Sequence, residues 1–343
     1  MFAALLEKLS KHYDLSADEA AGAMEEIMAG RAAPAQIGGL LIGLAMKGER
    51  PDEIVGLART MRANAVQLST PHASVFDTCG TGGDRSHTFN VSSVAALALA
   101  GCGVTVAKHG NRSVSSKCGS ADLFEVLGVN VAAPPAQVER CLDGAGIGFF
   151  FAPTFHPSMK HAGPARKDLG VRTAFNLLGP VTNPASATRQ LVGVPRPEFT
   201  ELVAKALALL GSERAWVVHG ADGLDEISTT GYTKVSECWR GVVNTFYLHP
   251  SEHGVPRAEM AALKGGTAKE NAEIARSVLS GAAGSPRDVV ALNAGAGLLI
   301  AGRVGTLREG VAMASRSLDD GAASRKLELM VELSNQAVGE PGS

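Results

Sequence analysis

The sequence predicts an α/β protein in two parts, a small N-terminal α-helical domain hinged to a large α/β domain with a central, mostly parallel sheet. The chain has 343 residues, more than the roughly 100–200 residues of one ordinary domain. Residues 1–72 carry helix signals and no strand pattern. From Ser74 onwards, short β-like runs alternate with glycine loops and helices, as in a parallel sheet. We therefore expect the α/β domain to comprise residues 73–343.

Helices in the first domain are marked by signals at their ends. Capping-box residues or proline mark the starts, and glycine marks two of the ends. The marking residues are Ser16, Glu19 and Gly30 for one helix, Pro34 and Gly48 for the next, and Pro51, Asp52 and Glu53 for a third.

In the α/β part, apolar runs bounded by turn residues predict the strands. The expected strands are 75–79, 104–107, 129–132, 148–151, 191–194, 216–219 and 242–248. Helices are expected at 92–100 and 121–127, and the apolar, glycine-rich segment 289–300 is interpreted as a buried helix.

Composition excludes several classes of protein. The 32 Lys and Arg against 34 Asp and Glu give a formal net charge of −2, whereas a nucleic-acid binder carries a clear excess of cations. The N-terminus lacks a signal-peptide pattern. The longest apolar stretch, 94–107, falls short of the ~20 residues that span a bilayer. We expect neither a nucleic-acid nor a membrane partner.

Cysteine and glycine usage narrows the class further. The five cysteines show no paired spacing and no close histidine, so neither a zinc site nor a disulfide framework is predicted. This usage fits a reduced, cytoplasmic protein. The 40 glycines follow no collagen period and are expected to serve loops.

The segment 165–186 interrupts the α/β pattern. It holds Arg166, Lys167 and Arg172 together with a Gly-Pro and an Asn-Pro pair, and such pairs mark turns. We expect a crossing or hinge that returns to the helical domain. Its basic residues would then lie across a cleft between the domains.

The first candidate site is the glycine-rich loop 80–84. Its glycines let backbone approach a ligand closely, and N–H groups in such turns can bind anions. Polar residues at 90–93 then open a helix, whose N-terminal N–H groups and dipole favour phosphate. The loop is neither a P-loop, which needs Gly-Lys-Ser/Thr, nor a dinucleotide fingerprint, which needs glycine where Arg85 stands. An ordinary turn is the alternative.

The second candidate site is the segment 108–120, which follows the expected strand 104–107. It carries three cations, four serines, an asparagine and two glycines, at the end of a strand where open α/β sheets bind ligands. Lysine and arginine supply charge, while hydroxyl and N–H groups form directional bonds to phosphate oxygens. A solvated basic loop is the alternative.

The third candidate site is the segment 219–228, after the run 216–218. Its adjacent Asp225 and Glu226 are hard oxygen ligands of the kind that Mg²⁺ takes, with water and substrate phosphates completing the octahedron. A solvated pair beside a turn is the alternative, and the segment by itself favours it.

Taken together, the three segments indicate one site with two anion-binding loops and a carboxylate pair, each after a strand. That combination predicts a magnesium complex of a di- or polyphosphorylated substrate. No nucleophile and base are paired in the sequence, so we expect group transfer by positioning and electrostatics rather than covalent catalysis.

At this point the sequence resembles the anthranilate phosphoribosyltransferase family over nearly its whole length. The motifs that carry the resemblance occur in the expected order. They are GTGGD with TFN and Ser-Ser, KHGNR with SVSSK and GSAD, HPSMKHAGPARKDLGVRTAFNLLGPVTNP, QLVGV and HGADGLDEIS. Their joint presence is highly specific, whereas the glycine-rich turn alone is not.

The resemblance implies an activity, a fold, a metal and partners. The family transfers 5-phosphoribosyl from phosphoribosyl diphosphate to the amine of anthranilate, giving N-(5-phosphoribosyl)anthranilate and pyrophosphate, the second step of tryptophan synthesis from chorismate. It implies a nucleoside-phosphorylase-like fold and a homodimer formed through the helical domain. It also implies Mg²⁺, with two ions expected per monomer.

The resemblance also implies roles for individual residues. Phosphoribosyl diphosphate would be held by Gly80, Gly83, Asp84, Thr88, Asn90, Val91, Ser92, Ser93, Lys108, His109, Gly110, Asn111, Arg112, Ser113, Val114, Ser115, Ser116 and Ser120. Anthranilate would contact Gly80, Asn111 and Arg166, and the metal would bind Ser92, Asp225 and Glu226. His109 and Arg172 would line the anthranilate channel. No dedicated catalytic side chain is implied.

The sequence departs from the family pattern at a few positions, where Thr78 and Cys79 replace an apolar pair, Ser93 replaces Thr and Cys118 replaces Ser. Each keeps small size or the hydroxyl. Two alternative functions stay open at this point. A pyrimidine-nucleoside phosphorylase of the same fold would need no metal pair at Asp225, and a nucleic-acid-binding paralogue would need a basic surface.

Overall fold

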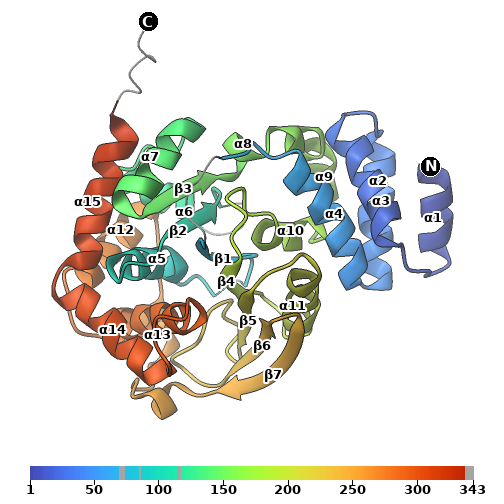
Figure 1. The fold of residues 1–343 in the computed structure, drawn as a ribbon. Helices are drawn as coiled ribbons and strands as arrows, with labels where there is room; N and C mark the ends of the chain where they lie inside the picture. Colours follow the sequence, from blue (N-terminus) through green and yellow to red (C-terminus); the bar gives the residue numbers. More distant parts are fainter. Residues whose placement is uncertain (69–73, 85, 114–116, 337–343) are drawn as a thin grey trace, which may run out of the picture.

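The computed structural model describes residues 1–68, 74–84, 86–113 and 117–336 (Figure 1). Its helices are α1 (Phe2–Ser10), α2 (Ala17–Met28), α3 (Pro34–Lys47), α4 (Pro51–Ala63), α5 (Val91–Gly101), α6 (Ser120–Val126), α7 (Pro135–Ala145), α8 (Ala152–Phe155), α9 (Gly163–Leu169), α10 (Phe175–Val181), α11 (Glu198–Leu209), α12 (Ala268–Leu279), α13 (Ser285–Ile300), α14 (Leu307–Asp319) and α15 (Ala322–Asn335). Its strands are β1 (Phe76–Gly80), β2 (Val106–Gly110), β3 (Ile147–Phe151), β4 (Arg189–Gly193), β5 (Arg214–Gly220), β6 (Thr233–Trp239) and β7 (Val242–Leu248).

The N-terminal helices begin and end where their sequence signals predict. At the start of α2, the Ser16 hydroxyl accepts a hydrogen bond from Glu19 N at 3.2 Å, and a Glu19 carboxylate oxygen accepts one from Ser16 N at 2.9 Å. This reciprocal pair satisfies two N–H groups that the helix itself cannot. Gly30 and Gly48 follow α2 and α3 with φ of 71° and 87°, which a residue with a side chain rarely adopts.

The seven strands form one sheet in the order β3-β2-β1-β4-β5-β6-β7. The five strands from β3 to β5 are parallel, and β6 and β7 are antiparallel additions. Strand β1 lies between β2 and β4, so the strand order reverses there. Ligands bind beyond the carboxyl ends of parallel strands at such a switch point. The loop after β1 is therefore placed for binding.

Helices cover both faces of the sheet (Figure 1). On one face, α5 packs against β1 and is itself covered by α13 and α15. On the other face, α10 contacts β1, and α11 packs against β5 and β6. The described helices include none that is both long enough and apolar enough to cross a membrane.

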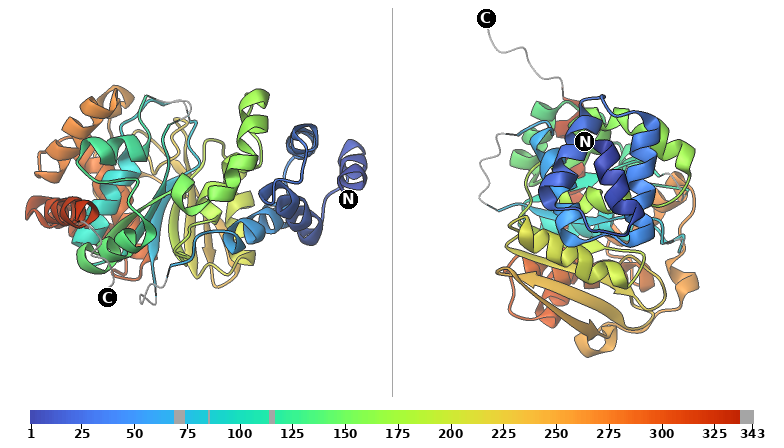
Figure 2. Two further views of the ribbon diagram at one scale, coloured as in Figure 1. Left: turned by 90° about the horizontal axis from the view of Figure 1, so that it is seen from above. Right: turned by 90° about the vertical axis from the view of Figure 1, so that its right-hand side faces the viewer.

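The helical domain lies at one end of the molecule (Figure 2) and shares a core with the α10–α11 face of the sheet. Helix α9 packs against α3, and both α10 and α11 pack against α4. The Arg62 guanidinium also donates to the carbonyl of Val181 at 2.8 Å. The segment between β3 and β4 therefore joins the helical domain to the sheet.

Two of the expected elements differ from the structure. Lys108, His109 and Gly110, expected in a loop, belong to β2, because the parallel pairing with β3 continues to Gly110 opposite Phe151. Residues 129–132 form no strand. Their alternating apolar side chains are buried without a partner strand, and Asn130 N donates to the Ser334 hydroxyl at 3.1 Å instead.

Strand β6 has no counterpart among the expected strands. Its residues include Lys234, Ser236 and Glu237, which dilute the apolar alternation. The sequence signal for this strand is the Arg-Gly pair that follows it. In the structure Arg240 and Gly241 form the turn to β7, with φ of 51° and 79°. A two-residue turn of this kind with glycine second is typical of a tight β-hairpin.

Two histidines are buried at the carboxyl end of the sheet. His109 on β2 is 5% exposed, and His156, just after α8, is 2% exposed. Their ring centroids lie 5.4 Å apart. Burial, followed by the neighbouring His156, lowers the pKa of His109 to about 3, and burial lowers the pKa of His156 to about 4. Both rings are therefore neutral near pH 7.

These lowered pKa values predict a loss of stability in acid. An ordinary histidine in the unfolded chain takes up a proton below pH ~6.5, while the folded rings do not until about pH 4 or 3. The stabilisation is thus full above pH ~6.5 and is lost as the pH falls towards the folded pKa. For each ring, the free energy of unfolding should fall by about 2 kcal/mol between pH 7 and pH 5. In urea unfolding over this pH range, the free energy of unfolding of His156→Phe should fall by about 2 kcal/mol less than that of the parent. Equal losses in the variant and the parent would contradict the assignment.

Candidate functional site

A cavity of about 620 Å³ opens at the carboxyl ends of β1 and β2. Residues of both anion-binding segments line it, together with the carboxylate pair after β5 and basic residues of the α9–α10 region. The predicted site residues on its wall are Gly80, Gly83, Asp84, Thr88, Asn90, Ser92, Ser93, Lys108, His109, Gly110, Asn111, Arg112, Ser113, Ser120, Arg166, Arg172, Asp225 and Glu226. Val91 is buried in α5 and is not on the wall. Val114, Ser115 and Ser116 lie outside the described residues, as does Arg85.

The loop after β1 depends on glycine because other backbone and side-chain atoms approach it closely. Gly82 and Gly83 have φ of 67° and 77°, a region that side chains disfavour. A Cβ on Gly80 would lie 2.6 Å from a carboxylate oxygen of Asp225. Gly82 N donates to the same carboxylate at 3.1 Å. The loop after β5 therefore rests directly on the loop after β1.

Helix α5 points its N-terminus at the cavity. Its first-turn Ser92 N donates to a Glu226 carboxylate oxygen at 3.1 Å, and the helix dipole favours an anion there. The hydroxyls of Thr81 and Ser93 are buried and have no hydrogen-bond partner within the described residues. Buried hydroxyls are usually paired, so these two are available to a bound ligand.

Asp225 and Glu226 form a carboxylate pair. Among the described residues, neither forms a salt bridge with a lysine or an arginine. Each keeps some exposure to the cavity but lies deep in it. Burial, and then repulsion from Asp84, raises the pKa of Asp225. Burial, and then repulsion from Asp225, raises the pKa of Glu226. Two crowded carboxylates of this kind are stabilised by a cation.

The chemistry of this donor set fits Mg²⁺. No group of three or more His, Cys, Asp or Glu side chains in the described ranges is arranged to hold a metal on its own. Mg²⁺ is usually bound by one or two carboxylates, with waters and substrate phosphates completing its octahedron. Asp225 and Glu226, with the Ser92 hydroxyl beside them on the wall, supply that partial set.

Lys108 is buried beneath the two loops. Its ammonium donates to the backbone carbonyl of Thr78 and, at 3.5 Å, to that of His109. Behind it, the buried Asp77 carboxylate accepts hydrogen bonds from His109 N at 3.1 Å and from the Asn183 amide at 2.8 Å. The attraction of Lys108 lowers the pKa of Glu226 against the larger effect of burial. Lys108 therefore supplies positive charge from below the cavity floor.

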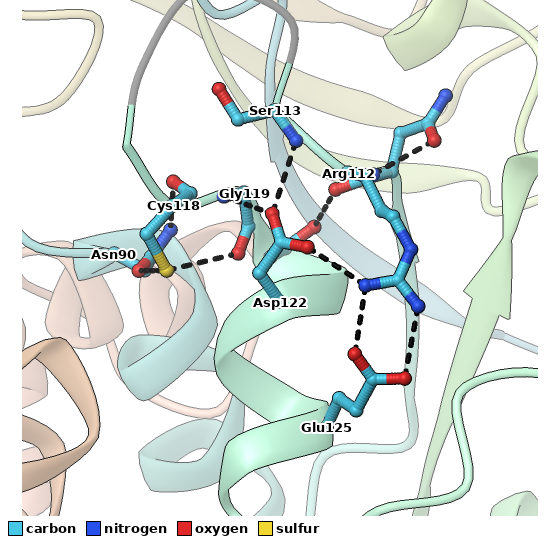
Figure 3. Close-up of polar contacts among 9 residues, drawn as sticks. Asn90, Arg112, Ser113, Cys118, Gly119, Asp122 and Glu125 are labelled. Carbon is cyan, nitrogen blue, oxygen red and sulfur yellow. Dashed lines mark hydrogen bonds and ion pairs between the residues drawn. The ribbon is translucent and has the colours of Figure 1, made fainter. Parts of the chain in front are cut away.

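The second anion-binding segment runs from the end of β2 into α6 (Figure 3). The Asn111 side-chain oxygen accepts a hydrogen bond from Arg112 N at 2.8 Å, and the Ser120 hydroxyl donates to the Asn111 carbonyl at 3.4 Å. The Arg112 guanidinium is paired with carboxylates of α6. Lys117 is exposed and is not on the cavity wall, so the basic character of this loop is only partly directed at the cavity.

The opposite end of the cavity is formed by α9, α10 and the two buried histidines. Arg166 projects from α9 with its guanidinium 5.7 Å from the Phe175 ring centroid. It has no hydrogen-bond or ion-pair partner among the residues described, and the surrounding protein lowers its pKa by desolvation. His109 Nδ1 lies 3.1 Å from the Gly179 carbonyl. This part of the wall offers the cation of Arg166 beside the Phe175 ring, together with two neutral histidines.

Arg172 connects the two ends of the cavity. It lies in the turn between α9 and α10, and a Cβ on Gly83 would fall within 1.6 Å of a guanidinium nitrogen. The hinge segment therefore reaches across the cavity to the glycine loop. A side chain at position 83 would displace the Arg172 guanidinium, and the φ of 77° there also favours glycine.

Sequence reasoning missed four residues that shape the site. His156 and Phe175 line the cavity, while Asp77 and Asn183 support Lys108 and His109 from behind. For Asn183 the sequence signal is an Asn-Pro pair, which by itself indicates a turn. For Asp77 it is an acidic residue inside an apolar strand run. For His156 and Phe175, the only indication in the sequence is that both lie in the long motif, beginning HPSMK, that carries the family resemblance.

The arrangement separates two kinds of chemistry. One end offers N–H groups, hydroxyls, Lys108 and a carboxylate pair suited to a metal–phosphate complex. The other offers the unpaired Arg166 beside aromatic surface, suited to an aromatic carboxylate. No side chain is set up as a nucleophile with its base in the described part of the cavity.

Two family models match the chain. Residues 3–65 match the helical bundle domain of a glycosyl transferase family, and residues 72–324 match the a/b domain of a glycosyl transferase family. The second match alone covers most of the chain. It therefore identifies a glycosyltransferase.

Similar proteins narrow the family. Anthranilate phosphoribosyltransferase of Moorella thermoacetica is 55% identical over 331 residues, 96% of this chain and 98% of that protein. The crystal structure of anthranilate phosphoribosyltransferase from Thermus thermophilus has a TM-score of 0.92 at 45% identity, covering 97% of this chain and 99% of that one. The Saccharomyces cerevisiae enzyme, solved in complex with PRPP and Mg, has a TM-score of 0.88 at 28% identity, covering 97% of both chains. The chain belongs to the anthranilate phosphoribosyltransferase family.

Proposed function

We propose that this chain transfers the 5-phosphoribosyl group of phosphoribosyl diphosphate to the amine of anthranilate and releases pyrophosphate. The observation that carries the proposal is the polarity of the cavity, with the unpaired Arg166 at one end and two anion-binding loops with a carboxylate pair at the other. The Saccharomyces relative, solved with PRPP and Mg, and in another structure with 4-fluoroanthranilate, supports this choice of substrates.

In this proposal the diphosphate lies over the loop after β1 and the N-terminus of α5. Backbone N–H groups of the glycine loop, the hydroxyls of Thr81 and Ser93, and Lys108 from below would hold its oxygens. The remaining predicted contacts in both loops keep the roles given above, except Arg112, which the carboxylates of α6 hold. Developing negative charge on the departing pyrophosphate then meets donors that are already fixed in place.

The metal role is assigned to Asp225 and Glu226, with the Ser92 hydroxyl. The use of Mg²⁺ is supported by the Saccharomyces structure with PRPP and Mg. We further propose two ions per monomer. When bound, the metal would neutralise charge on the leaving pyrophosphate. Gly82 N and Ser92 N each hold one carboxylate in its orientation.

Anthranilate is placed at the Arg166 end. The guanidinium can pair with its carboxylate through two parallel hydrogen bonds, and Asn111 and Gly80 are assigned to the ring and amine. The neutral His109 and His156 add no charge that would repel Arg166 or protonate the amine. The unprotonated amine is already a nucleophile, so orientation toward the anomeric carbon is the main requirement.

We also propose a domain division, a homodimer and a cellular location. The division into residues 1–72 and 73–343 is supported by the two family-model matches. A homodimer through the helical domain is supported by the exposure there of Tyr13 (61%) and Met46 (74%), and sedimentation as a monomer at micromolar concentration would contradict it. The cytoplasmic location rests on the cysteine usage alone.

The direct test is a fluorescence assay. With phosphoribosyl diphosphate and Mg²⁺ present, anthranilate fluorescence should fall with time, and one pyrophosphate should appear per anthranilate consumed. Excess EDTA should stop the reaction, because the carboxylate pair then lacks its cation. Folded protein that consumes no anthranilate with both substrates saturating would refute the proposed function.

The metal role predicts the behaviour of Asp225→Asn with Glu226→Gln. Turnover should fall at least about 100-fold, because charge on the leaving pyrophosphate is no longer neutralised. The apo protein should be at least as stable to heat, since two crowded carboxylates are removed. Asp319→Asn with Asp320→Asn, two adjacent exposed acids at the C-terminal end of α14, is the control. Unchanged magnesium dependence in the first variant would place the metal elsewhere.

The anthranilate role predicts a selective effect of Arg166→Ala. The KM for anthranilate should rise about 10- to 100-fold, as expected for loss of a charge-assisted pair, while affinity for phosphoribosyl diphosphate is kept. Lys167→Ala, an exposed neighbour on α9 outside the cavity wall, should change neither. If the variant at 166 loses phosphoribosyl diphosphate instead, Arg166 belongs to the other substrate.

A further inference from the structure

The guanidinium of Arg112 is held by two carboxylates of α6 (Figure 3). Two of its nitrogens donate to the two oxygens of Glu125 at 2.8 and 2.9 Å, and one of them also donates to Asp122 at 2.9 Å. The two parallel bonds to Glu125 match the planar fork of arginine. The Phe151 ring adds a contact at 5.9 Å from its centroid. Arg112 is thus engaged on the side that faces α6.

Asp122 also holds the two ends of the anion-binding segment together. Its second oxygen accepts hydrogen bonds from Gly119 N at 2.8 Å and from Ser113 N at 3.2 Å. Partial burial would raise the pKa of Asp122, but the Gly119, Arg112 and Ser113 hydrogen bonds outweigh it and lower the pKa overall. The carboxylate is therefore charged near pH 7 and binds three donors at once.

The two ends of this segment are packed closely where Asp122 holds them. A Cβ on Gly119 would lie 2.4 Å from Ser113 N and 2.6 Å from the Asn111 carbonyl. From the same end, the Asn90 amide donates to the Cys118 carbonyl at 3.3 Å. The base of this segment is therefore tied both to α6 and to the residue that caps α5.

Two roles for Arg112 make different demands on this geometry. As a phosphate ligand, Arg112 must leave Glu125 and Asp122, so the two carboxylates compete with the substrate. As an anchor, it stays where it is and the carboxylates assist binding by fixing the backbone at Ser113 and Gly119. The bidentate pair with Glu125 and the shared use of Asp122 by Arg112, Ser113 and Gly119 favour the anchor.

We propose that Arg112, Asp122 and Glu125 form a clasp that positions the second anion-binding loop for phosphoribosyl diphosphate, and that Arg112 does not itself ligate phosphate. The three are positioning residues. This revises the role expected for Arg112 from the family pattern and adds Asp122 and Glu125 to the residues on which substrate affinity depends. The proposal rests on the proposed function, since it takes phosphoribosyl diphosphate as the ligand of this loop.

The decisive experiment is a double-mutant cycle on Arg112→Met and Glu125→Gln, read by calorimetric binding of phosphoribosyl diphosphate in the presence of Mg²⁺. The sign of the Glu125→Gln effect separates the two roles. A clasp predicts weaker binding, by about three- to tenfold, in each single variant. It also predicts that the double variant is no weaker than the worse single variant, because both changes remove the same interaction.

A kinetic split excludes a general loss of structure. The KM for phosphoribosyl diphosphate should rise while the KM for anthranilate stays within about twofold. Arg287→Met and Asp319→Asn form a matched control, because Arg287 also donates to both oxygens of an exposed carboxylate, at 2.7 and 2.8 Å, away from the cavity wall. These two variants should change neither constant.

If Glu125→Gln binds phosphoribosyl diphosphate as tightly as the parent or more tightly, the proposal is wrong. In that case Arg112, no longer held by Glu125, binds the substrate itself. Additive losses in the double variant overturn the proposal as well. Because the cycle is read by binding of one substrate, it stands or falls without anthranilate turnover. A parent protein that binds phosphoribosyl diphosphate but does not consume anthranilate refutes the proposed reaction alone.

Discussion

The site depends on the close contact between the loop after β5 and the glycine ends of β1 and β4. Gly80 and Gly193 are paired in register, and a Cβ on Gly193 would fall 1.5 Å from the Asp225 carbonyl. Only glycine at both positions lets the loop descend until its carboxylates meet Gly82 N and the first turn of α5. The glycine-rich composition is therefore a packing requirement here, because the chain brings three backbone segments to one point.

That contact sets the electrostatics of the cavity. Two carboxylates and Asp84 are crowded where the strand order reverses, and the positive charge of Lys108 and the N-terminus of α5 lie close to the pair. At the far end, Arg166 stands beside the Phe175 ring, and the two histidines on the cavity wall are neutral. On the proposed function, each end is thus complementary to one substrate. Catalysis then follows from bringing the two substrates together in a fixed orientation, with no dedicated base.

The helix ends of the first domain and the ligand-binding edge of the sheet could be predicted from the sequence, because both depend on residues close together in the chain. Caps, prolines and glycines fix the helix ends in the first domain, and glycine loops after apolar runs point to the ligand edge of the sheet. Lys108 was misplaced because a strand end is decided by its neighbour, here β3, and not by its own residues. His156 and Phe175 could not be found from pattern, since the tertiary fold alone brings them beside Arg166. The roles assigned to individual site residues stay predictions.

The two ends of the cavity belong to different packing units, which constrains how the site can work. Ala165 and Phe175, flanking Arg166, are part of the core that includes Ile37 and Leu41 of α3. Leu224 and Ile227, flanking the carboxylate pair, are part of the core formed with α5 and α13. The two cores lie on opposite faces of the same strands, since Val192 and Val217 belong to the first core and Leu191 and Trp216 to the second. The sheet therefore ties the Arg166 end of the cavity to the carboxylate end. At the cavity the Arg172 guanidinium lies over Gly83, where a Cβ would meet a guanidinium nitrogen, so a larger residue at position 83 would displace the tip of this arginine from the glycine loop.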